Sequence, residues 1–125
     1  MSVIVVGYSA KPEGTAALDK AIDAARLLGH QLVVVHTLET TDEVSQLAQT
    51  LAQTGIEHQV RAARDPHDPA EDVLATAERT DASFIVLGLR QRSPVGKLLL
   101  GSNAQRVLLD AACPVLAVKA PNPPR

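Results

Sequence analysis

The sequence lacks any long apolar run, and this absence argues against a membrane-spanning protein. A helix that crosses a bilayer needs about 20 consecutive apolar residues, and no stretch of this chain approaches that length. The apolar run at residues 3–6 is brief, has no basic leader and ends at Gly7, so it does not resemble a signal peptide. We therefore expect a cytoplasmic protein that does not bind membranes.

An excess of basic charge is also lacking. Fourteen acidic and twelve basic side chains give a net charge of -2. The chain as a whole therefore does not attract polyanions, and we expect it to bind neither nucleic acid nor an anionic membrane surface. Neutral small molecules and other proteins remain as partners, and the sequence does not identify a protein partner.

Cysteine is nearly absent, and the potential metal ligands are scattered. The single Cys113 cannot form an internal disulfide, which agrees with a reducing compartment. Beside Pro114, this residue is interpreted as a small buried apolar side chain. None of the four histidines has ligand spacing to another histidine or to Cys113, so no metal site is predicted.

Two histidines leave alternatives open. His67 lies between Asp65 and Asp68, where it either belongs to a metal-binding group or, more simply, to a turn that leads into a helix. His36 ends an apolar run, where it either lines a pocket or is only the polar end of a strand.

Five short apolar runs alternate with four helical patterns, which is typical of a parallel sheet covered by helices. Because most runs are apolar at successive positions, we expect strands buried on both faces. The sequence therefore predicts one α/β domain over residues 1–120, followed by a loose tail at 121–125. The predicted strands lie at residues 3–6, 32–35, 57–61, 84–87 and 115–118.

The segments between these runs carry apolar residues at helical spacing together with signals for helix ends. Thr40 and Glu43, for example, fit a capping box at the start of the second helix. The other signals are Pro12 and Gly29 around the first helix, Gly55 after the second, Asp68 and Pro69 opening the third, and a fourth helix running from Ser102 to Ala111.

The segment between the fourth strand and the fourth helix is the strongest candidate for a binding site. Ligands of open parallel sheets bind beyond the carboxyl ends of the strands. Gly101, Ser102 and Asn103 open a helix there, and unpaired N–H groups at a helix N-terminus bind anions. Positive charge is added by Arg90, Arg92 and Lys97.

An alternative interpretation is that Ser102 only caps the helix, in a capping box with Gln105, while the cations are solvated. The common catalytic and phosphate motifs are absent: no G-x-G-x-x-G occurs, and Gly96-Lys97 is followed by Leu98, which rules out a Walker A loop. No paired carboxylates and no placed general base are evident, so no catalytic residue is predicted.

Residues 88–118 resemble the universal stress protein family. Members of this family that bind ATP carry a glycine, two residues, a second glycine, nine residues, and then glycine with serine or threonine. Gly88 matches the first glycine, Gly101 and Ser102 match the end, and the closing Cys-Pro-Val-Leu-Ala-Val at 113–118 also fits. The resemblance implies an open five-stranded sheet of order 3-2-1-4-5 and a homodimer in which the strand from Val115 to Val118 pairs with its copy.

The resemblance also implies an adenine nucleotide, ATP or AMP, with magnesium if ATP binds. Two departures are present: Gln91 replaces the middle glycine, and Ser9 stands where an aspartate is expected near the ribose. The implied site therefore has Tyr8 and Thr37 at adenine, Ser9 at the ribose, and Gly88, Gly101, Ser102 and Asn103 at the phosphates. Gly7, Arg90 and Gln91 complete the set of predicted binding residues.

Two functions stay open at this point. The first is a dimeric stress-response sensor that binds a nucleotide, and the second is a dimeric interaction protein whose cleft is vestigial. Slow ATP hydrolysis is a third, less favoured possibility.

Overall fold

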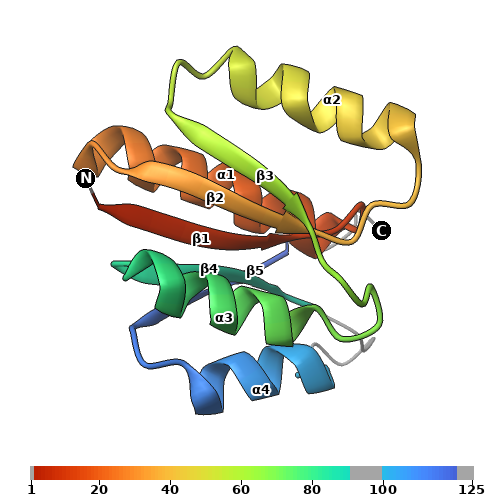
Figure 1. Cartoon of the computed structure of the whole chain (residues 1–125), viewed down its shortest axis with the longest axis vertical. Coiled ribbons are helices and arrows are strands. Elements are labelled where there is room, and N and C mark those ends of the chain that lie inside the picture. The colour runs from red at the N-terminus through yellow and green to blue at the C-terminus, as the bar shows by residue number, and fades with distance from the viewer. Residues whose placement is uncertain (1, 91–99, 121–125) are drawn as a thin grey trace.

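The computed structural model of the chain describes residues 2–90 and 100–120. It contains a five-stranded parallel sheet of order β3-β2-β1-β4-β5, with four helices (Figure 1). This confirms the predicted fold class and strand order. The elements are β1 (Val3–Tyr8), α1 (Pro12–Leu28), β2 (Gln31–His36), α2 (Thr41–Ala52), β3 (His58–Ala62), α3 (Pro69–Thr80), β4 (Phe84–Leu89), α4 (Ser102–Asp110) and β5 (Val115–Lys119).

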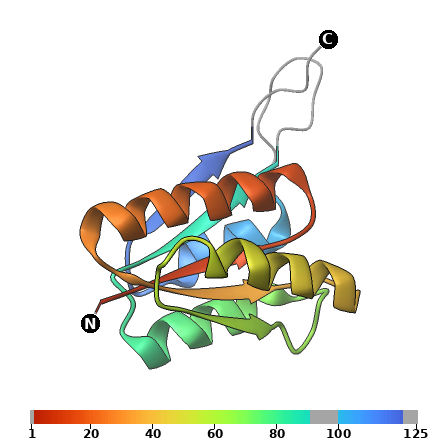
Figure 2. The same cartoon turned by 90° about the horizontal axis from the view of Figure 1, so that it is seen from above.

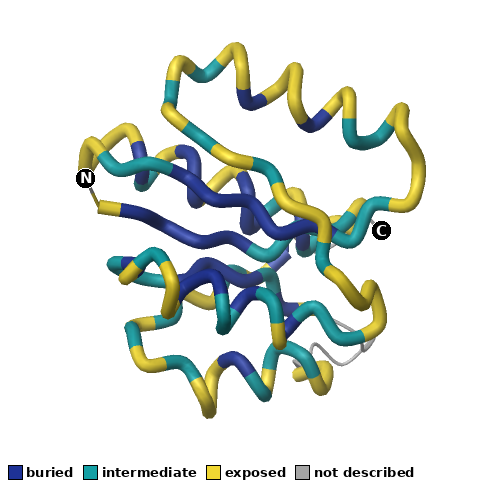
Figure 3. Tube along the Cα trace, in the orientation of Figure 1, coloured by how far each residue is buried: buried dark blue, intermediate teal, exposed yellow. Residues whose placement is uncertain are grey.

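The helices cover the sheet in two layers, α1 and α2 on one face and α3 and α4 on the other (Figure 2). Alternate residues of β1 enter the two resulting cores, because successive side chains of a strand point to opposite faces. Ile4 packs with Leu18 and Leu47 under α1 and α2, whereas Val5 packs with Val73 and Val107 under α3 and α4. The central strands are accordingly buried along most of their length (Figure 3).

The two edge strands differ from the central ones. The sequence predicted β3 at residues 57–61, and the structure places it one residue later. The run at 115–118 was interpreted as a buried type of strand, but β5 is exposed at several positions of the isolated chain, and Leu116 is 41% exposed. Each edge strand pairs on one side only and lacks a complete helical cover, so apolar sequence alone did not reveal its exposure.

Most helix ends follow the sequence signals. Gly29 ends α1 in the left-handed conformation (φ 71°), and the capping box of α2 is present, with the Glu43 N–H donating to Thr40 Oγ1 over 3.1 Å. The start of α4 differs from the prediction, because Gly101 occupies the cap position without a side-chain bond and Ser102 is the first helical residue. The capping-box alternative for Ser102 is therefore wrong, and α4 ends at Asp110 rather than at Ala111.

Within the described part of the chain, none of the helices combines the length and apolar character that crossing a membrane requires.

Candidate functional site

A cavity of about 270 Å³ opens beyond the carboxyl ends of β1 and β4. The strand order reverses between these two strands, since β2 pairs on one side of β1 and β4 on the other. This is the place where open α/β sheets bind ligands. The lining residues are Gly7, Tyr8, Ser9, Lys11, Glu13, Gly14, Val35, Thr37, Pro69, Ala70, Val73, Leu87, Gly88, Asn103, Ala104 and Val107.

The first turn of α1 forms one wall of the cavity, and two glycines set its position. A Cβ atom on Gly14 would lie 2.7 Å from Ser9 Oγ and closer still to the Ser9 backbone. A Cβ atom on Gly88 would lie 2.9 Å from Glu13 Cβ and closer still to the Glu13 carbonyl group. Both positions therefore require glycine for packing, whatever the cavity binds.

Six of the residues predicted for the site line this cavity together: Gly7, Tyr8, Ser9, Thr37, Gly88 and Asn103. Arg90, Gly101 and Ser102 do not belong to its lining. Arg90 lies at the end of β4, where its Nε is 3.9 Å from Glu13 Oε1 in a partly exposed ion pair. Gln91, Arg92 and Lys97 lie outside the described residues.

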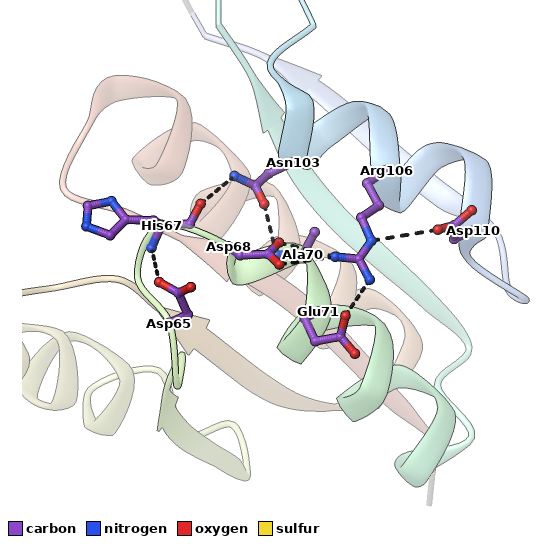
Figure 4. Close-up of polar contacts among 8 residues, drawn as sticks. All are labelled: Asp65, His67, Asp68, Ala70, Glu71, Asn103, Arg106 and Asp110. Atoms are coloured by element: carbon purple, nitrogen blue, oxygen red, sulfur yellow. Dashed lines mark hydrogen bonds and ion pairs between the residues drawn. The ribbon is translucent and has the colours of Figure 1, made fainter.

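The side chain of Asn103 is engaged in bonds between two helices (Figure 4). Its Oδ1 accepts a hydrogen bond from the backbone N–H of Ala70 over 3.2 Å, and its Nδ2 donates to the carbonyl oxygen of His67 over 3.5 Å. Asn103 thus satisfies one of the backbone donors at the start of α3. Asp68 occupies the cap position of α3 but makes no capping bond with its side chain, contrary to the prediction.

Asp68 instead belongs to a cluster of charges around Arg106 of α4 (Figure 4). The guanidinium contacts Asp68 at 3.2 Å, Glu71 through a short hydrogen bond, and Asp110 at 3.7 Å. The hydrogen bond with Glu71, followed by the charges of the three carboxylates, raises the pKa of Arg106 above its ordinary value. These exposed contacts join α4 to the start of α3 beside the cavity.

The cavity combines apolar surface with the N-terminal ends of three helices. Val35, Val73, Leu87 and Val107 supply aliphatic side chains to the lining. The first turns of α1, α3 and α4 supply the residue pairs Glu13 and Gly14, Pro69 and Ala70, and Asn103 and Ala104. Because helix N-termini carry partial positive charge, this arrangement can hold a ligand with a flat apolar part and an anionic part.

Most of the residues that line the cavity were not predicted from the sequence. Lys11 and Glu13 follow β1 directly, so their place beyond the strand end was a usable signal. The aliphatic residues and the start of α3 carry no comparable signal, because only the packing of α3 against the sheet brings them to the cavity.

The two ambiguous histidines are not part of the cavity. The side chain of His36 is buried, its Nδ1 accepts a hydrogen bond from the Leu38 N–H over 3.1 Å, and burial lowers its pKa. The backbone N–H of His67 donates to Asp65 Oδ1 over 2.9 Å, as in a turn. Over residues 2–90 and 100–120, no group of three or more His, Cys, Asp or Glu side chains is placed to hold a metal ion.

A parallel sheet of this order, with helices on both faces and a cavity where the order reverses, defines a Rossmann-like α/β protein. The model of the universal stress protein family matches residues 1–119, and the chain belongs to this family.

Three relatives illustrate the similarity. A universal stress protein from Mycolicibacterium smegmatis is 39% identical over 127 residues, which cover 94% of this chain and 97% of that protein. The structure of a universal stress protein from Archaeoglobus fulgidus is 32% identical, with a TM-score of 0.68 and coverage of 95% and 98% of the two chains. The structure of the universal stress protein from Archaeoglobus fulgidus in complex with dAMP is 27% identical, with a TM-score of 0.63 and the same coverage.

Proposed function

We propose that this chain is a small cytoplasmic stress-response module that binds an adenine nucleotide in the cavity beyond β1 and β4. The observation that carries the proposal is the meeting of an aliphatic surface and three helix N-termini around one cavity of about 270 Å³. A base fits the first feature and phosphates fit the second. The relative from Archaeoglobus fulgidus that binds dAMP supports the same ligand class for this chain.

In this proposal the adenine lies against Tyr8 and Thr37, and the ribose lies near Ser9. The backbone N–H of Thr37 donates to the Tyr8 carbonyl over 3.1 Å, so Thr37 would contact the base through its hydroxyl or its carbonyl oxygen. The phosphates lie near Gly88 and the start of α4 at residues 101–103. A diphosphate or triphosphate extends furthest toward α4, and magnesium accompanies ATP.

Ser9 changes how the ribose is held. Its hydroxyl oxygen accepts only a long hydrogen bond, 3.4 Å from the Lys11 backbone nitrogen. A serine hydroxyl both donates and accepts, whereas a carboxylate offers two charged acceptor oxygens to the ribose hydroxyls. We therefore expect weaker ribose binding than a carboxylate at this position would give.

The test is calorimetric titration of the full chain with ATP, ADP, AMP and cyclic AMP, each with and without magnesium. Gly101→Val serves as the site variant. A Cβ at Gly101 meets nothing within 4 Å and its φ is -65°, so the variant should fold while its side chain fills space beside the N–H groups of α4. We expect binding to the wild type and its loss in the variant. Unchanged affinity for the nucleotide in Gly101→Val would mean that the phosphates do not bind beside α4.

A second candidate function is that of a dimeric interaction protein that binds no nucleotide. The observation that favours it is β5, an edge strand with Leu116 41% exposed, because an unpaired apolar edge is a template for pairing with another chain. We propose that β5 pairs with its copy in a homodimer under either function. A wild type that binds none of the four nucleotides would favour this candidate. Slow ATP hydrolysis is the least supported possibility, because the sequence offers no placed general base.

A further inference from the structure

A second hollow, of about 320 Å³, lies beside a different face of α3. Pro69, Ala70 and Val73 of this helix line the cavity described above, whereas Asp72, Thr76 and Arg79 line the second hollow. The latter three follow one another at intervals of four and three residues, so they share one face of the helix. The two hollows are therefore separate sites, with only the buried Val35 in common.

The second hollow exists because α3 does not extend over the edge of the sheet. The helix packs on β1, β2 and β4, and β3 lies at the edge beyond β2 (Figure 1). Arg61 of β3 is in register with Val35 of β2, so both side chains are on the face that carries α3. Val35 is buried under the helix, whereas Arg61 is exposed in the uncovered part.

The charges of the hollow are strongly unbalanced. Three arginines, Arg61, Arg64 and Arg79, face one carboxylate, Asp72. Arg64 engages Asp72 twice, through Nε at 3.1 Å and through its backbone N–H in a short hydrogen bond. That backbone bond, with further contributions from the charges of Arg64 and Arg61, lowers the pKa of Asp72. Among the described residues, Arg61 and Arg79 have no carboxylate within ion-pair distance.

Thr76 adds a buried donor to this basic hollow. Its side chain is 2% exposed, and its hydroxyl oxygen accepts a hydrogen bond from Arg79 Nη2 over 3.4 Å. A threonine hydroxyl that accepts a hydrogen bond still carries a hydrogen, with which it can donate to a ligand. Two guanidiniums and this hydroxyl together form a set of donors that suits an oxyanion.

We propose that Arg61, Arg79 and Thr76 form a second anion site, separate from the nucleotide cavity, that binds a small phosphate-bearing molecule. Planar guanidiniums bind phosphate oxygens in pairs, and an anion between them relieves their mutual repulsion. The volume of about 320 Å³ is at the lower end of the range for ligand pockets, roughly 300–1,000 Å³. The hollow is large enough for inorganic phosphate or a small phosphate monoester.

The test follows backbone amide signals of the full chain by NMR during titration with inorganic phosphate and, separately, with glycerol 3-phosphate. Ionic strength is held constant with sodium chloride. We expect shifts at Arg61, Ala62 and Thr76 that saturate with either phosphate and do not appear with chloride alone. Tighter binding of glycerol 3-phosphate would identify a monoester as the ligand, and equal or tighter binding of inorganic phosphate would identify the free ion.

The site variant is the double substitution Arg61→Gln with Arg79→Gln, which should weaken binding by about tenfold or more, equivalent to ~1.4 kcal/mol. Both side chains are exposed, so the fold should persist. The single variant Arg79→Lys keeps the charge but loses the planar fork, and we expect intermediate affinity. Arg26→Gln is the control, because Arg26 is an exposed arginine near the end of α1.

Equal affinity in the double variant and the control would overturn the proposal. So would shifts confined to Ala70 and Asn103, since these would locate the phosphate in the nucleotide cavity. The double variant should keep the affinity of the nucleotide cavity for AMP, which separates this test from the test of nucleotide binding.

Discussion

Asn103, in the first turn of α4, accepts a hydrogen bond from the backbone N–H of Ala70 in the first turn of α3, over 3.2 Å. One helix thus supplies the cap of another that is 33 residues away in the sequence. Both residues line the same cavity, so the cap and the proposed nucleotide site share an amide group.

Replacing Asn103 with alanine should destabilise the protein by about 1 kcal/mol, the usual effect of losing a helix cap. Asn103→Asp keeps an acceptor for the Ala70 N–H but adds a negative charge beside the proposed phosphates. We therefore expect Asn103→Asp to be nearly as stable as the wild type and to bind nucleotide more weakly. Urea denaturation and calorimetry measure the two effects.

Gln105→Ala is the control for both measurements, because Gln105 is exposed on α4. If Asn103→Ala and Gln105→Ala were equally stable, Asn103 would not act as a cap. If Asn103→Asp bound nucleotide like the wild type, the phosphates would lie away from this side chain.

Gly88 and Gly101 lie at the two ends of the predicted phosphate segment. Substitution by alanine should change the stability of the protein differently at these two positions. Gly88→Ala places a methyl group against the backbone of Glu13 and should cost about 1–3 kcal/mol of stability, as overpacking does. Gly101→Ala meets nothing within 4 Å and should leave stability unchanged or slightly higher. Thermal unfolding of the pair checks this, and equal melting temperatures would show that α1 can shift away from Gly88.

The exposed edge strand gives a prediction about assembly. Leu116→Lys should shift the protein from dimer to monomer, because a charge is added where we propose that β5 meets its copy. Leu27→Lys is the control for an added charge, since Leu27 is 85% exposed near the end of α1. Sedimentation velocity at several concentrations measures the outcome. A wild type that sediments as a monomer at all of them would contradict the proposed homodimer.

The burial of His36 should make the free energy of unfolding depend on pH. Because burial lowers the pKa of His36 below its ordinary value of 6.5, the unfolded chain takes up a proton at a higher pH than the folded one. This contribution to stability is fully present above pH 6.5 and is lost as the pH falls toward the folded pKa. The free energy of unfolding should therefore decrease below pH 6.5 in the wild type.

His36→Asn should reduce that decrease, whereas His30→Asn, a change at the partly exposed residue after α1, should retain it. Denaturation by urea across this pH range measures both. Parallel curves for the wild type and His36→Asn would show that His36 does not cause the dependence.

The sequence predicted the features that depend on short-range patterns. The central strands follow from apolar runs, and the capping box of Thr40 and Glu43 follows from spacing, because both patterns arise within a few residues. The contacts of Asn103 with Ala70 and of Arg106 with Asp68 each join residues more than thirty positions apart. Such contacts depend on how α3 and α4 pack on the sheet, which no local pattern specifies.

The candidate site, too, could be predicted from the sequence only in part. Its place beyond β1 and β4 could be predicted, because it follows from the topology of a parallel sheet. The packing role of Gly14 could not, because it results from the close approach of α1 to Ser9. The alternative that Ser102 caps α4 was wrong because Gly101 takes the cap position, with its carbonyl accepting from the Gln105 N–H over 3.0 Å.

The two walls of the cavity are held in place by different kinds of contact. The wall formed by α1 lies so close to Ser9 and β4 that no Cβ atom fits at Gly14 or at Gly88. The opposite wall, formed by α3 and α4, is joined by exposed ion pairs around Arg106 that salt screens. We therefore expect added salt to weaken the contacts of α4 with the start of α3 and to leave the packing of α1 unchanged.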